Sequence, residues 1–391
     1  MRVSQRVQQI QPSATLTINA KATEMRNKGQ DVVSLAAGEP DFLPPEHVME
    51  RARQAIDWNM VRYTPVPGTN ELRDAAAEYF SRFYQVDPGR ERILITNGGK
   101  HALYNLFQAL LDPGDQVIVP APYWVSYPEM IRLSDAIPVC PGTDPEMSFL
   151  LDGQTLRENC GPRTRALILN TPSNPTGCHY TQNQLDKLIE TALKQGLFVI
   201  SDEVYDQLVF PPAQTSSAAK WADSHPESVA VVNALSKSFS LTGWRVGFVL
   251  AHEELVEGMN KIQSQSTSNV CNVAQEAAVA ALRGSFQFLK EQREILARRR
   301  DLAMDYINSW PGVQCPTPDG AFYIFPRVDG YFHKKIPDST AMCSHLLEEA
   351  GVALVPGAAF GDDRCIRISY AVHEDKLSQA LQKLGASLSR I

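Results

Sequence analysis

Residues 166–202 read ALILNTPSNPTGCHYTQNQLDKLIETALKQGLFVISD, and this stretch decides the fold class. Two short apolar runs, 166–169 and 197–200, lie on either side of residues 181–195, where apolar side chains recur at helical spacing. Runs that are apolar on both faces are typical of strands covered on both sides, as in a parallel sheet. The stretch therefore predicts a strand–helix–strand unit of an α/β protein.

The same alternation extends along the chain. Further short apolar runs that end at turn residues lie at 93–96, 116–119, 229–232 and 246–249, and a second helix is predicted over 100–111. These elements predict a mainly parallel central sheet with helices on both faces.

The pattern changes after about residue 286. Residues 289–310 predict one long charged helix, and short apolar runs follow at 322–325 and 365–368. We expect a smaller α+β domain in this part of the chain. The expected organisation is an N-terminal segment (1–45) that packs with the small domain, a large domain (46–288) and a small C-terminal domain (289–391).

Composition excludes several classes of protein. The chain has 391 residues, of which 43% are apolar and 21% charged, close to the average of soluble globular proteins. Its net charge of −7 argues against a partner such as nucleic acid or an anionic membrane, although a local group of Lys and Arg can still bind a small anion. Seven unpatterned cysteines predict reduced thiols and no metal site. With no apolar signal segment within 1–10, we expect a cytoplasmic protein.

Ligands of α/β sheets bind beyond the carboxyl ends of the strands, so the loops there are where functional residues are sought. Residues 95–100, ITNGGK, follow a strand and open a helix, where two glycines and the helix dipole favour an anion. An ordinary tight turn explains these glycines equally well. The spacing of a P-loop is absent, so a nucleoside triphosphate is not expected.

Two further strand ends carry reactive groups. Asp202 follows the run 197–200, and taken alone it is better explained as a helix N-cap. The alternative is that its carboxylate pairs with a cationic ring nitrogen of a ligand. The Tyr205 phenol would then lie near the same ligand. Lys237 follows the run 229–232, where a desolvated amine can become a nucleophile, although most lysines are solvated surface groups. In the loop 169–177, two prolines direct Asn174, and a plain turn explains that loop nearly as well.

Taken together and in this order, the motifs resemble the class I pyridoxal-phosphate aminotransferases. The resemblance rests on NPTG at 174–177, SDEVY at 201–205, and SK at 236–237 followed by Arg245. It extends over nearly the whole chain, through AGEPD at 37–41, YTPVPG at 63–68, PYWVSY at 122–127, PDGAFY at 318–323 and RISY at 367–370. Within the family the chain is most similar to the bacterial aspartate aminotransferases of the aspartate/prephenate branch, through PSAT at 12–15, GGK at 98–100 and SQST at 264–267.

The resemblance implies that the cofactor is pyridoxal 5′-phosphate. Lys237 matches the lysine that forms a Schiff base with the cofactor and moves the substrate proton, and Asp202 matches the acid paired with the pyridine nitrogen, which makes the ring an electron sink. Tyr205 and Asn174 match the groups that hydrogen bond the 3′-oxygen of the cofactor ring, and Trp124 matches the aromatic ring that stacks on the pyridine. The remaining implied cofactor contacts are to the phosphate, from Gly99, Lys100, Ser236 and Arg245, and from Tyr63 of the neighbouring subunit.

The resemblance also implies how the substrate binds. Arg367 matches the arginine that holds the α-carboxylate in a bidentate fork, and Gly38, Trp124 and Asn174 lie against the substrate. The arginine that reads the distal carboxylate in other aspartate aminotransferases is absent from residues 264–272. Lys100, with Thr15 or Ser13, is expected to replace it.

A second departure concerns the phosphate. Ala234 stands where the family usually has Ser or Gly, so a phosphate-binding hydroxyl is missing, and Ser236 is the candidate replacement.

The implied function is amino transfer from L-aspartate to 2-oxoglutarate, giving oxaloacetate and L-glutamate, in a homodimer with shared sites. Prephenate is an alternative acceptor, alone or as a second activity. Two other classes of function are less consistent with the sequence. A transcription regulator needs a basic DNA-binding segment ahead of the motif at Gly38, and Asn174, Arg367 and Lys100 argue against a lyase or decarboxylase.

Overall fold

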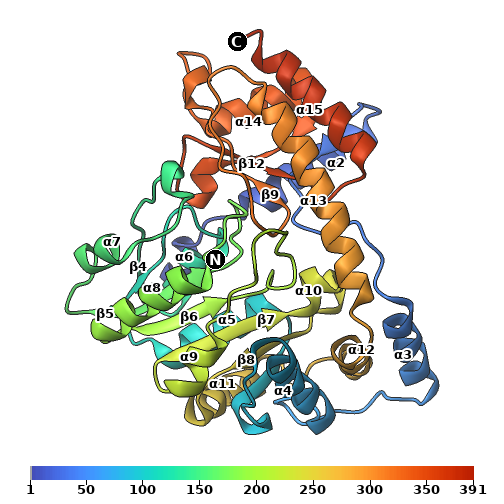
Figure 1. Ribbon diagram of the computed structural model, residues 1–391, viewed down its shortest axis with the longest axis vertical. Coiled ribbons are helices and arrows are strands. Elements are labelled where there is room, and N and C mark those ends of the chain that lie inside the picture. Colours follow the sequence, from blue (N-terminus) through green and yellow to red (C-terminus); the bar gives the residue numbers. More distant parts are fainter. Residues whose placement is uncertain (1) are drawn as a thin grey trace.

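A seven-stranded sheet forms the centre of the larger part of the molecule in this computed structural model, which describes residues 2–391 (Figure 1). Met1, part of the expected N-terminal segment, lies outside the described residues. In spatial order the strands are β2 (Ile93–Thr96), β8 (Gly247–Leu250), β7 (Val229–Ala234), β6 (Phe198–Asp202), β5 (Thr164–Asn170), β3 (Gln116–Ile118) and β4 (Ile137–Val139). Within this sheet β8 alone runs antiparallel to its neighbours, which confirms the mainly parallel sheet.

Helices cover both faces of this sheet because its strands are apolar on both sides. On β5, Leu167 and Leu169 face one apolar cluster, whereas Ala166 and Ile168 face the other. The first cluster is covered by α4 (Asn70–Tyr84), α7 (Gly153–Glu158), α8 (Gln182–Lys194), α9 (Ala219–Ser224) and α12 (Asn272–Arg283), with α3 (Glu46–Asp57) packed on α12. The second is covered by α5 (Gly99–Leu110), α6 (Ser126–Leu133) and α11 (Glu253–Ser266). The predicted helices 100–111 and 181–195 are confirmed as α5 and α8 to within a residue of each end.

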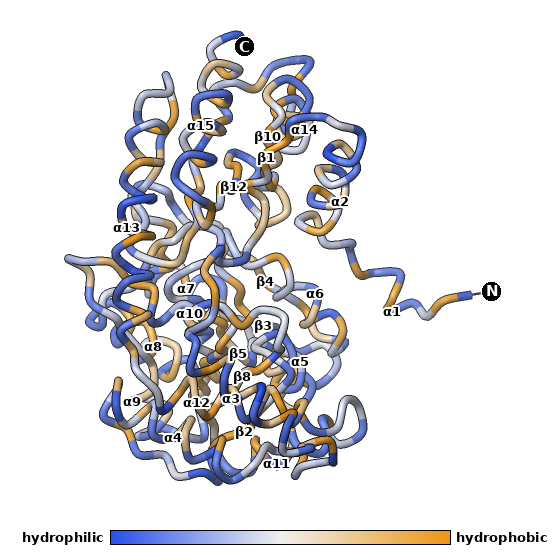
Figure 2. The backbone as a smooth tube through the Cα atoms, turned by 90° about the vertical axis from the view of Figure 1, so that its right-hand side faces the viewer, coloured by the Kyte–Doolittle hydropathy of each residue, from blue (hydrophilic) through white to orange (hydrophobic). Residues whose placement is uncertain are grey.

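The smaller part of the molecule joins α2 and β1, from near the start of the chain, to the C-terminal elements, and lies above the sheet in Figure 1. Its helices are α13 (Gln287–Asn308), α14 (Ser339–Ala350) and α15 (Glu374–Leu388), and its antiparallel sheet has the order β11 (Val355–Pro356), β12 (Ile366–Ser369), β9 (Tyr323–Ile324). The N-terminal strand β1 (Val33–Ser34) pairs with β10 (Val352–Ala353), and α2 (Ala14–Asn27) contacts β10 and β11. Figure 2 shows α1 (Gln5–Gln8) lying away from the rest of the backbone. The Arg6–Asp135 ion pair of 2.6 Å tethers it.

Strand register decides what meets at the carboxyl edge of the large sheet. Asn170, the last residue of β5, pairs with Asp202, the last residue of β6. Because β8 is antiparallel, its first residue, Gly247, pairs with both Thr96 and Ala234. The loop before β8 and the loop after β2 therefore lie at the same edge, and α10 (Leu235–Ser238) starts there directly after β7.

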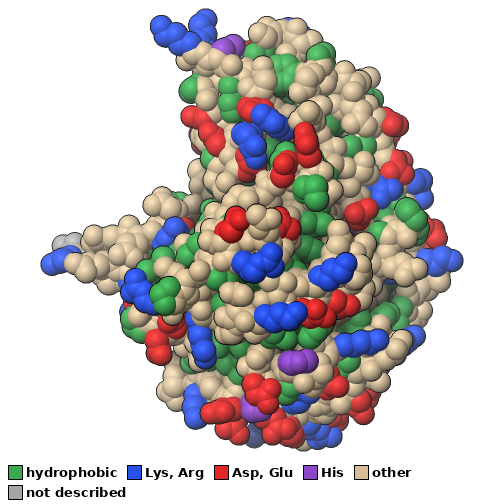
Figure 3. Space-filling view, turned by 60° about the vertical axis from the view of Figure 1, so that its left-hand side comes forward, with side chains coloured by type: hydrophobic (Ala, Val, Ile, Leu, Met, Phe, Trp, Pro, Cys, Tyr) green, Lys and Arg blue, Asp and Glu red, His purple; other side chains and the backbone are tan. Residues whose placement is uncertain are grey.

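The surface carries charges of both signs, interspersed over the face shown in Figure 3. All seven cysteines are free, and three of them, Cys178, Cys343 and Cys365, are buried. None of the helices described in residues 2–391 is long and apolar enough to cross a membrane.

Candidate functional site

A cavity of about 320 Å³ opens at the carboxyl edge of the large sheet, and every predicted site residue except Tyr63 lines it. The predicted residues that it brings together are Ser13, Thr15, Gly38, Gly99, Lys100, Trp124, Asn174, Asp202, Tyr205, Ser236, Lys237, Arg245 and Arg367. Tyr63 is 91% exposed and lines a separate surface hollow with residues 267–269 and 271–273. Its expected role involves a second subunit, so it stays a prediction.

Lys237 lies in the short helix α10, directly after β7. Its Nζ donates a 2.6 Å hydrogen bond to the carbonyl oxygen of Gly38. Burial lowers the pKa of Lys237 to about 8; Glu39 opposes this shift, and the nearby cations Arg245, Arg367 and Lys100 add to it. A larger fraction of this amine is therefore neutral near pH 7 than of a surface lysine, as a nucleophile or base requires.

Asp202 is the last residue of β6 and is 2% exposed. The strand continues past residue 200, where its apolar run ends, because Ser201 and Asp202 still pair with β5 and β7. No helix begins after it, so the N-cap alternative is wrong. Its carboxylate accepts hydrogen bonds from the Tyr127 hydroxyl (2.6 Å) and the Val204 N–H (3.3 Å). Burial raises the pKa of Asp202 to about 6, and these two hydrogen bonds and Lys237 hold it below a higher value.

The loop between β2 and α5 forms a cradle beside Arg245. Gly98 has φ +83°, and a Cβ on it would overlap the Arg245 guanidinium. Arg245 itself has φ +56° and donates from Nη1 to the Thr242 carbonyl at 2.8 Å. The first N–H groups of α5, beginning at Gly99, and this guanidinium are hydrogen-bond donors that lie side by side. Together they favour binding of an anion such as a phosphate monoester.

Lys100 follows this cradle but directs its side chain across the cavity. Its Nζ lies 5.0 Å from the centroid of the Trp124 ring. Burial, and then the neighbouring Arg245, lower the pKa of Lys100. Nζ is thus a partly desolvated cation beside an aromatic face.

Arg367, on β12, is a buried guanidinium, 2% exposed. Nη1 donates to Asn174 Oδ1 at 3.0 Å and Nη2 donates to the Ala36 carbonyl at 2.7 Å, while the buried Nε has no partner among the described residues. Its Cζ lies 4.5 Å from the centroid of the Tyr323 ring. Burial lowers its pKa, and the phenols of Tyr323 and Tyr205 oppose this. A buried cation held by neutral groups alone is a binding point for a carboxylate.

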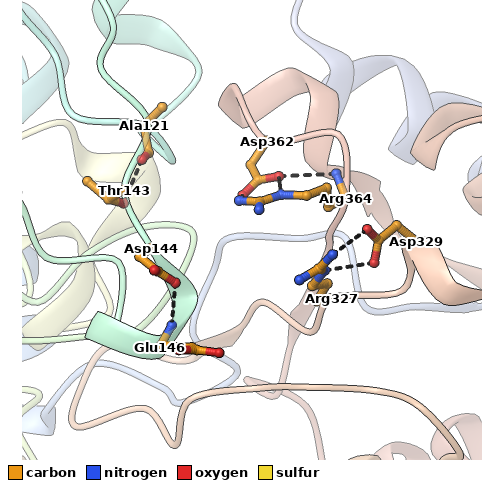
Figure 4. Close-up of polar contacts among 8 residues, drawn as sticks. All are labelled: Ala121, Thr143, Asp144, Glu146, Arg327, Asp329, Asp362 and Arg364. Carbon is orange, nitrogen blue, oxygen red and sulfur yellow. Dashed lines mark hydrogen bonds and ion pairs between the residues drawn. The ribbon is translucent and has the colours of Figure 1, made fainter.

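A second hollow, shown in Figure 4, provides a contrast. Arg327 is paired bidentately with Asp329 (2.8 and 2.8 Å), and Arg364 with Asp362 (2.8 and 2.7 Å). These arginines already hold carboxylates, whereas Arg367 is held by an amide and a carbonyl. Of these three arginines, Arg367 is therefore the one left without a carboxylate partner among the described residues.

Three lining residues that were given no role from the sequence make hydrogen bonds at the site: Asn170, Tyr127 and Tyr323. Asn170 donates from Nδ2 to the Asp202 carbonyl (3.0 Å) and accepts from the Asn174 N–H (2.8 Å). The Tyr323 and Tyr205 hydroxyls are hydrogen bonded at 3.0 Å, and Tyr127 binds Asp202. Tyr127 and Tyr323 belong to quoted motifs, and Asn170 ends a predicted strand, so the signals were present without a role attached.

The cavity thus combines a partly neutral amine, a buried carboxylate, an anion cradle and the aromatic ring of Trp124. This donor set fits a flat, phosphate-bearing ring that has a basic nitrogen and a carbonyl group. The carboxylate would bind the nitrogen, and the amine would bind the carbonyl carbon. Arg367 and Lys100 remain for the carboxylates of a second molecule.

Comparison with known proteins gives consistent matches over the whole length. The family described as aminotransferase class I and II matches residues 30–384. The chain is 41% identical to the aspartate/prephenate aminotransferase of Cereibacter sphaeroides (98% of each chain covered) and 38% identical to the aspartate aminotransferase of Bacillus subtilis (98% of each). The structure of the aspartate aminotransferase from Thermus thermophilus with maleate superposes with a TM-score of 0.94 at 41% identity, covering 99% of this chain and 100% of that one.

Proposed function

Since the chain belongs to the family of class I and II aminotransferases, we propose that it carries an amino group from L-aspartate to 2-oxoglutarate, giving oxaloacetate and L-glutamate, with pyridoxal 5′-phosphate as its cofactor. One observation carries the proposal: a single cavity holds the partly neutral amine of Lys237, the buried Asp202, and two cations, Arg367 and Lys100, that have no carboxylate partner among the described residues.

The chain's residues fit the cofactor in defined ways. The cradle of Gly99, Ser236 and Arg245 would hold the phosphate, and Asp202 would hold a proton at the ring nitrogen. Asn174 and Tyr205 would bind the ring oxygen, and Trp124 would cover one face. When bound, pyridoxal phosphate supplies an electron sink for the charge left at the substrate's α-carbon.

The remaining steps are performed by side chains of the protein. Arg367 orients the amino acid by binding its α-carboxylate as a fork, which fixes the direction of the Cα–H bond. Lys237 Nζ accepts this α-proton as a base and donates it again later in the reaction as an acid. The closely packed backbone at Gly38, where any Cβ would overlap the Tyr323 hydroxyl, lets the Lys237 amine hydrogen bond a main-chain oxygen.

The distal carboxylate of a dicarboxylic substrate would bind Lys100 with Thr15 or Ser13. All three residues line the cavity together with Trp124. The absence of arginine from 264–272 leaves Lys100 as the cation for this role.

Prephenate is the second candidate acceptor. The Cereibacter relative is named for both aspartate and prephenate, and Lys100 and Thr15, which would bind a second carboxylate, both line the cavity. The relative rates with the two acceptors decide between a single and a double activity.

We also propose that the protein is cytoplasmic and forms a homodimer. In this dimer, Tyr63 of each subunit reaches the phosphate bound by the other. The support is that Tyr63 and Val61, 91% and 84% exposed, line a surface hollow of about 920 Å³. For the single chain we propose the domain division at about residue 288. Within the N-terminal segment 1–45, α2 and β1 pack on the small domain through β10 and β11, whereas α1 is tied to Asp135 of the large domain.

The test is a substrate panel. The protein loaded with pyridoxal phosphate is assayed with aspartate or glutamate as donor and 2-oxoglutarate, oxaloacetate or prephenate as acceptor, and kcat/KM is measured for each pair. Rapid turnover of aspartate with 2-oxoglutarate supports the proposal. Release of CO₂ or elimination products without amino transfer would instead indicate a lyase or decarboxylase.

A further inference from the structure

Tyr127 lies near the start of α6 and contacts two residues to which the proposed function gives cofactor roles. Its hydroxyl donates a 2.6 Å hydrogen bond to Asp202 Oδ2. Its ring meets the Trp124 ring edge to face, with centroids 5.3 Å apart and an interplanar angle of 83°. Tyr127 is 2% exposed and lines the cavity. One side chain thus contacts both the carboxylate and the aromatic face.

The Tyr127 hydroxyl is a permanent donor to Asp202. Burial and the neighbouring Asp202 carboxylate raise the pKa of Tyr127 well above its ordinary value, so the phenol keeps its proton. A short hydrogen bond from a neutral hydroxyl to a carboxylate is charge-assisted and roughly twice as strong as a neutral one. It stabilises the ionised form of a carboxylate that burial would otherwise neutralise.

The other groups around Asp202 leave this task to Tyr127. Asn170 binds the main-chain carbonyl of Asp202, and Lys237 Nζ binds the Gly38 carbonyl. Tyr205 is hydrogen bonded to Tyr323. Among the residues that the structure describes, Tyr127 is the one side chain that hydrogen bonds the Asp202 carboxylate, while the Val204 N–H binds Oδ1 at 3.3 Å.

We propose that Tyr127 is a positioning residue that keeps Asp202 ionised and aimed at the cofactor's ring nitrogen. The inference rests on the proposed function, because it assigns Asp202 to that nitrogen. It adds a residue for which the sequence motifs indicated no role.

The test uses Tyr127→Phe, which keeps the ring and removes the hydroxyl. Equilibrium binding of pyridoxal phosphate to the apoprotein weakens about tenfold to hundredfold, the range expected for loss of one hydrogen bond to a charged group. In the holoenzyme, the pH midpoint of the visible absorbance band moves upward. A ring nitrogen that carries less positive charge repels the proton on the Lys237 nitrogen less strongly, so this proton is retained to higher pH. A merely structural role would leave this midpoint in place.

Tyr84→Phe is the matched control. The Tyr84 hydroxyl donates to a buried aspartate, Asp206, at 2.5 Å, and neither residue lines the cavity. This variant removes a buried hydroxyl that donates to a carboxylate, while Tyr79 still donates to the same Asp206 oxygen. Its unfolding free energy reports the structural cost of a lost buried hydroxyl. Its cofactor affinity and absorbance midpoint stay at the wild-type values.

A double-mutant cycle with Asp202→Asn shows whether Tyr127 acts through the carboxylate. In the Asp202→Asn background, Tyr127→Phe changes cofactor affinity less than about twofold. If the wild-type protein binds pyridoxal phosphate, and Tyr127→Phe and Tyr84→Phe have the same cofactor affinity and absorbance midpoint, this inference is wrong and the proposed function stands. The same holds if Tyr127→Phe weakens cofactor binding equally in the Asp202→Asn background. A wild-type protein that binds no pyridoxal phosphate contradicts the proposed function itself.

Discussion

Lys100 carries its positive charge in the first turn of α5, where the helix dipole disfavours a cation. Burial and the neighbouring Arg245 add to this cost, and both lower its pKa. Its contact with the Trp124 face, at 5.0 Å, offsets part of the loss. A substrate carboxylate would offset the rest, so we propose that selection for dicarboxylic substrates depends on Lys100.

Replacing this cation therefore discriminates between substrates. With Lys100→Ser we expect kcat/KM for aspartate to fall about tenfold to hundredfold, as for loss of a hydrogen-bonded charge pair, and kcat/KM for alanine to change about twofold or less. Lys261→Ser, on the exposed side of α11, is the control and leaves both values unchanged. Equal losses for aspartate and alanine would contradict the assigned role.

Lys237 gives a prediction about pH. Its pKa of about 8 in the protein without ligand lies below the ordinary lysine value, and burial is the main cause. The neutral amine is the reactive form, so covalent uptake of pyridoxal phosphate by the apoprotein accelerates about fivefold between pH 7 and 8 and levels off above about pH 9. Stopped-flow absorbance measures this rate.

Borohydride reduction followed by peptide mapping then locates the label on Lys237, with Lys237→Ala as the unlabelled control. A rate that still rises nearly tenfold per pH unit around pH 9 would indicate an ordinary surface lysine.

Some of the residues that the sequence identified, such as Asn174, Asp202 and Lys237, follow apolar runs, so a one-dimensional pattern places them at one edge of the sheet. Asp202 and Lys237 were found in this way and lie in one cavity. The sequence pattern did not identify Tyr127, because its proposed role depends on a contact between α6 and β6 with a residue 75 positions away in sequence. No periodicity or motif spacing reports such a contact.

Among the elements, β8 shows what a sequence pattern cannot specify. All four of its residues are buried, and a strand buried on both faces looks the same in either direction. The apolar run at 246–249 predicted a strand but not that it runs antiparallel between β2 and β7. This direction has a functional consequence, because it brings the chain that precedes β8, with Arg245, to the Gly98–Gly99 loop.

Gly247, the first residue of β8, tests this arrangement. A Cβ at this position would lie 2.6 Å from main-chain atoms of Gly98 and Gly99, so Gly247→Ala must displace the anion cradle. We expect the affinity for pyridoxal phosphate to fall at least about tenfold, because a hydrogen bond to phosphate is charge-assisted and depends on position.

Gly243→Ala is the control, since a Cβ there meets nothing within 4 Å and its φ is not left-handed. Equilibrium dialysis of both apoproteins with the cofactor gives the comparison. Equal affinities would show that the cradle does not hold the phosphate.

At the scale of the whole molecule, the site is assembled from segments that are distant in sequence. Ser13, Thr15 and Gly38 come from the N-terminal region, and Arg367 comes from β12. The parallel pair β1–β10 and the Ser369 N–H to Leu35 carbonyl hydrogen bond (2.8 Å) hold these segments together. Residues 33 and 352 pair across most of the chain, which local patterns could not predict; here the resemblance to a family supplied what the residue pattern lacked.

Tyr63 is the predicted site residue that this single chain leaves outside the cavity, with 91% of its surface exposed. If it reaches the phosphate of a second subunit, each site takes Lys237 from one chain and Tyr63 from the other. A dimer made of one Lys237→Ala chain and one Tyr63→Ala chain then contains one intact site. Purified after co-expression with two different tags, this mixed dimer should show about half the wild-type kcat, far above either variant alone. Activity no greater than that of the Tyr63→Ala protein would mean that Tyr63 does not complete a neighbouring site.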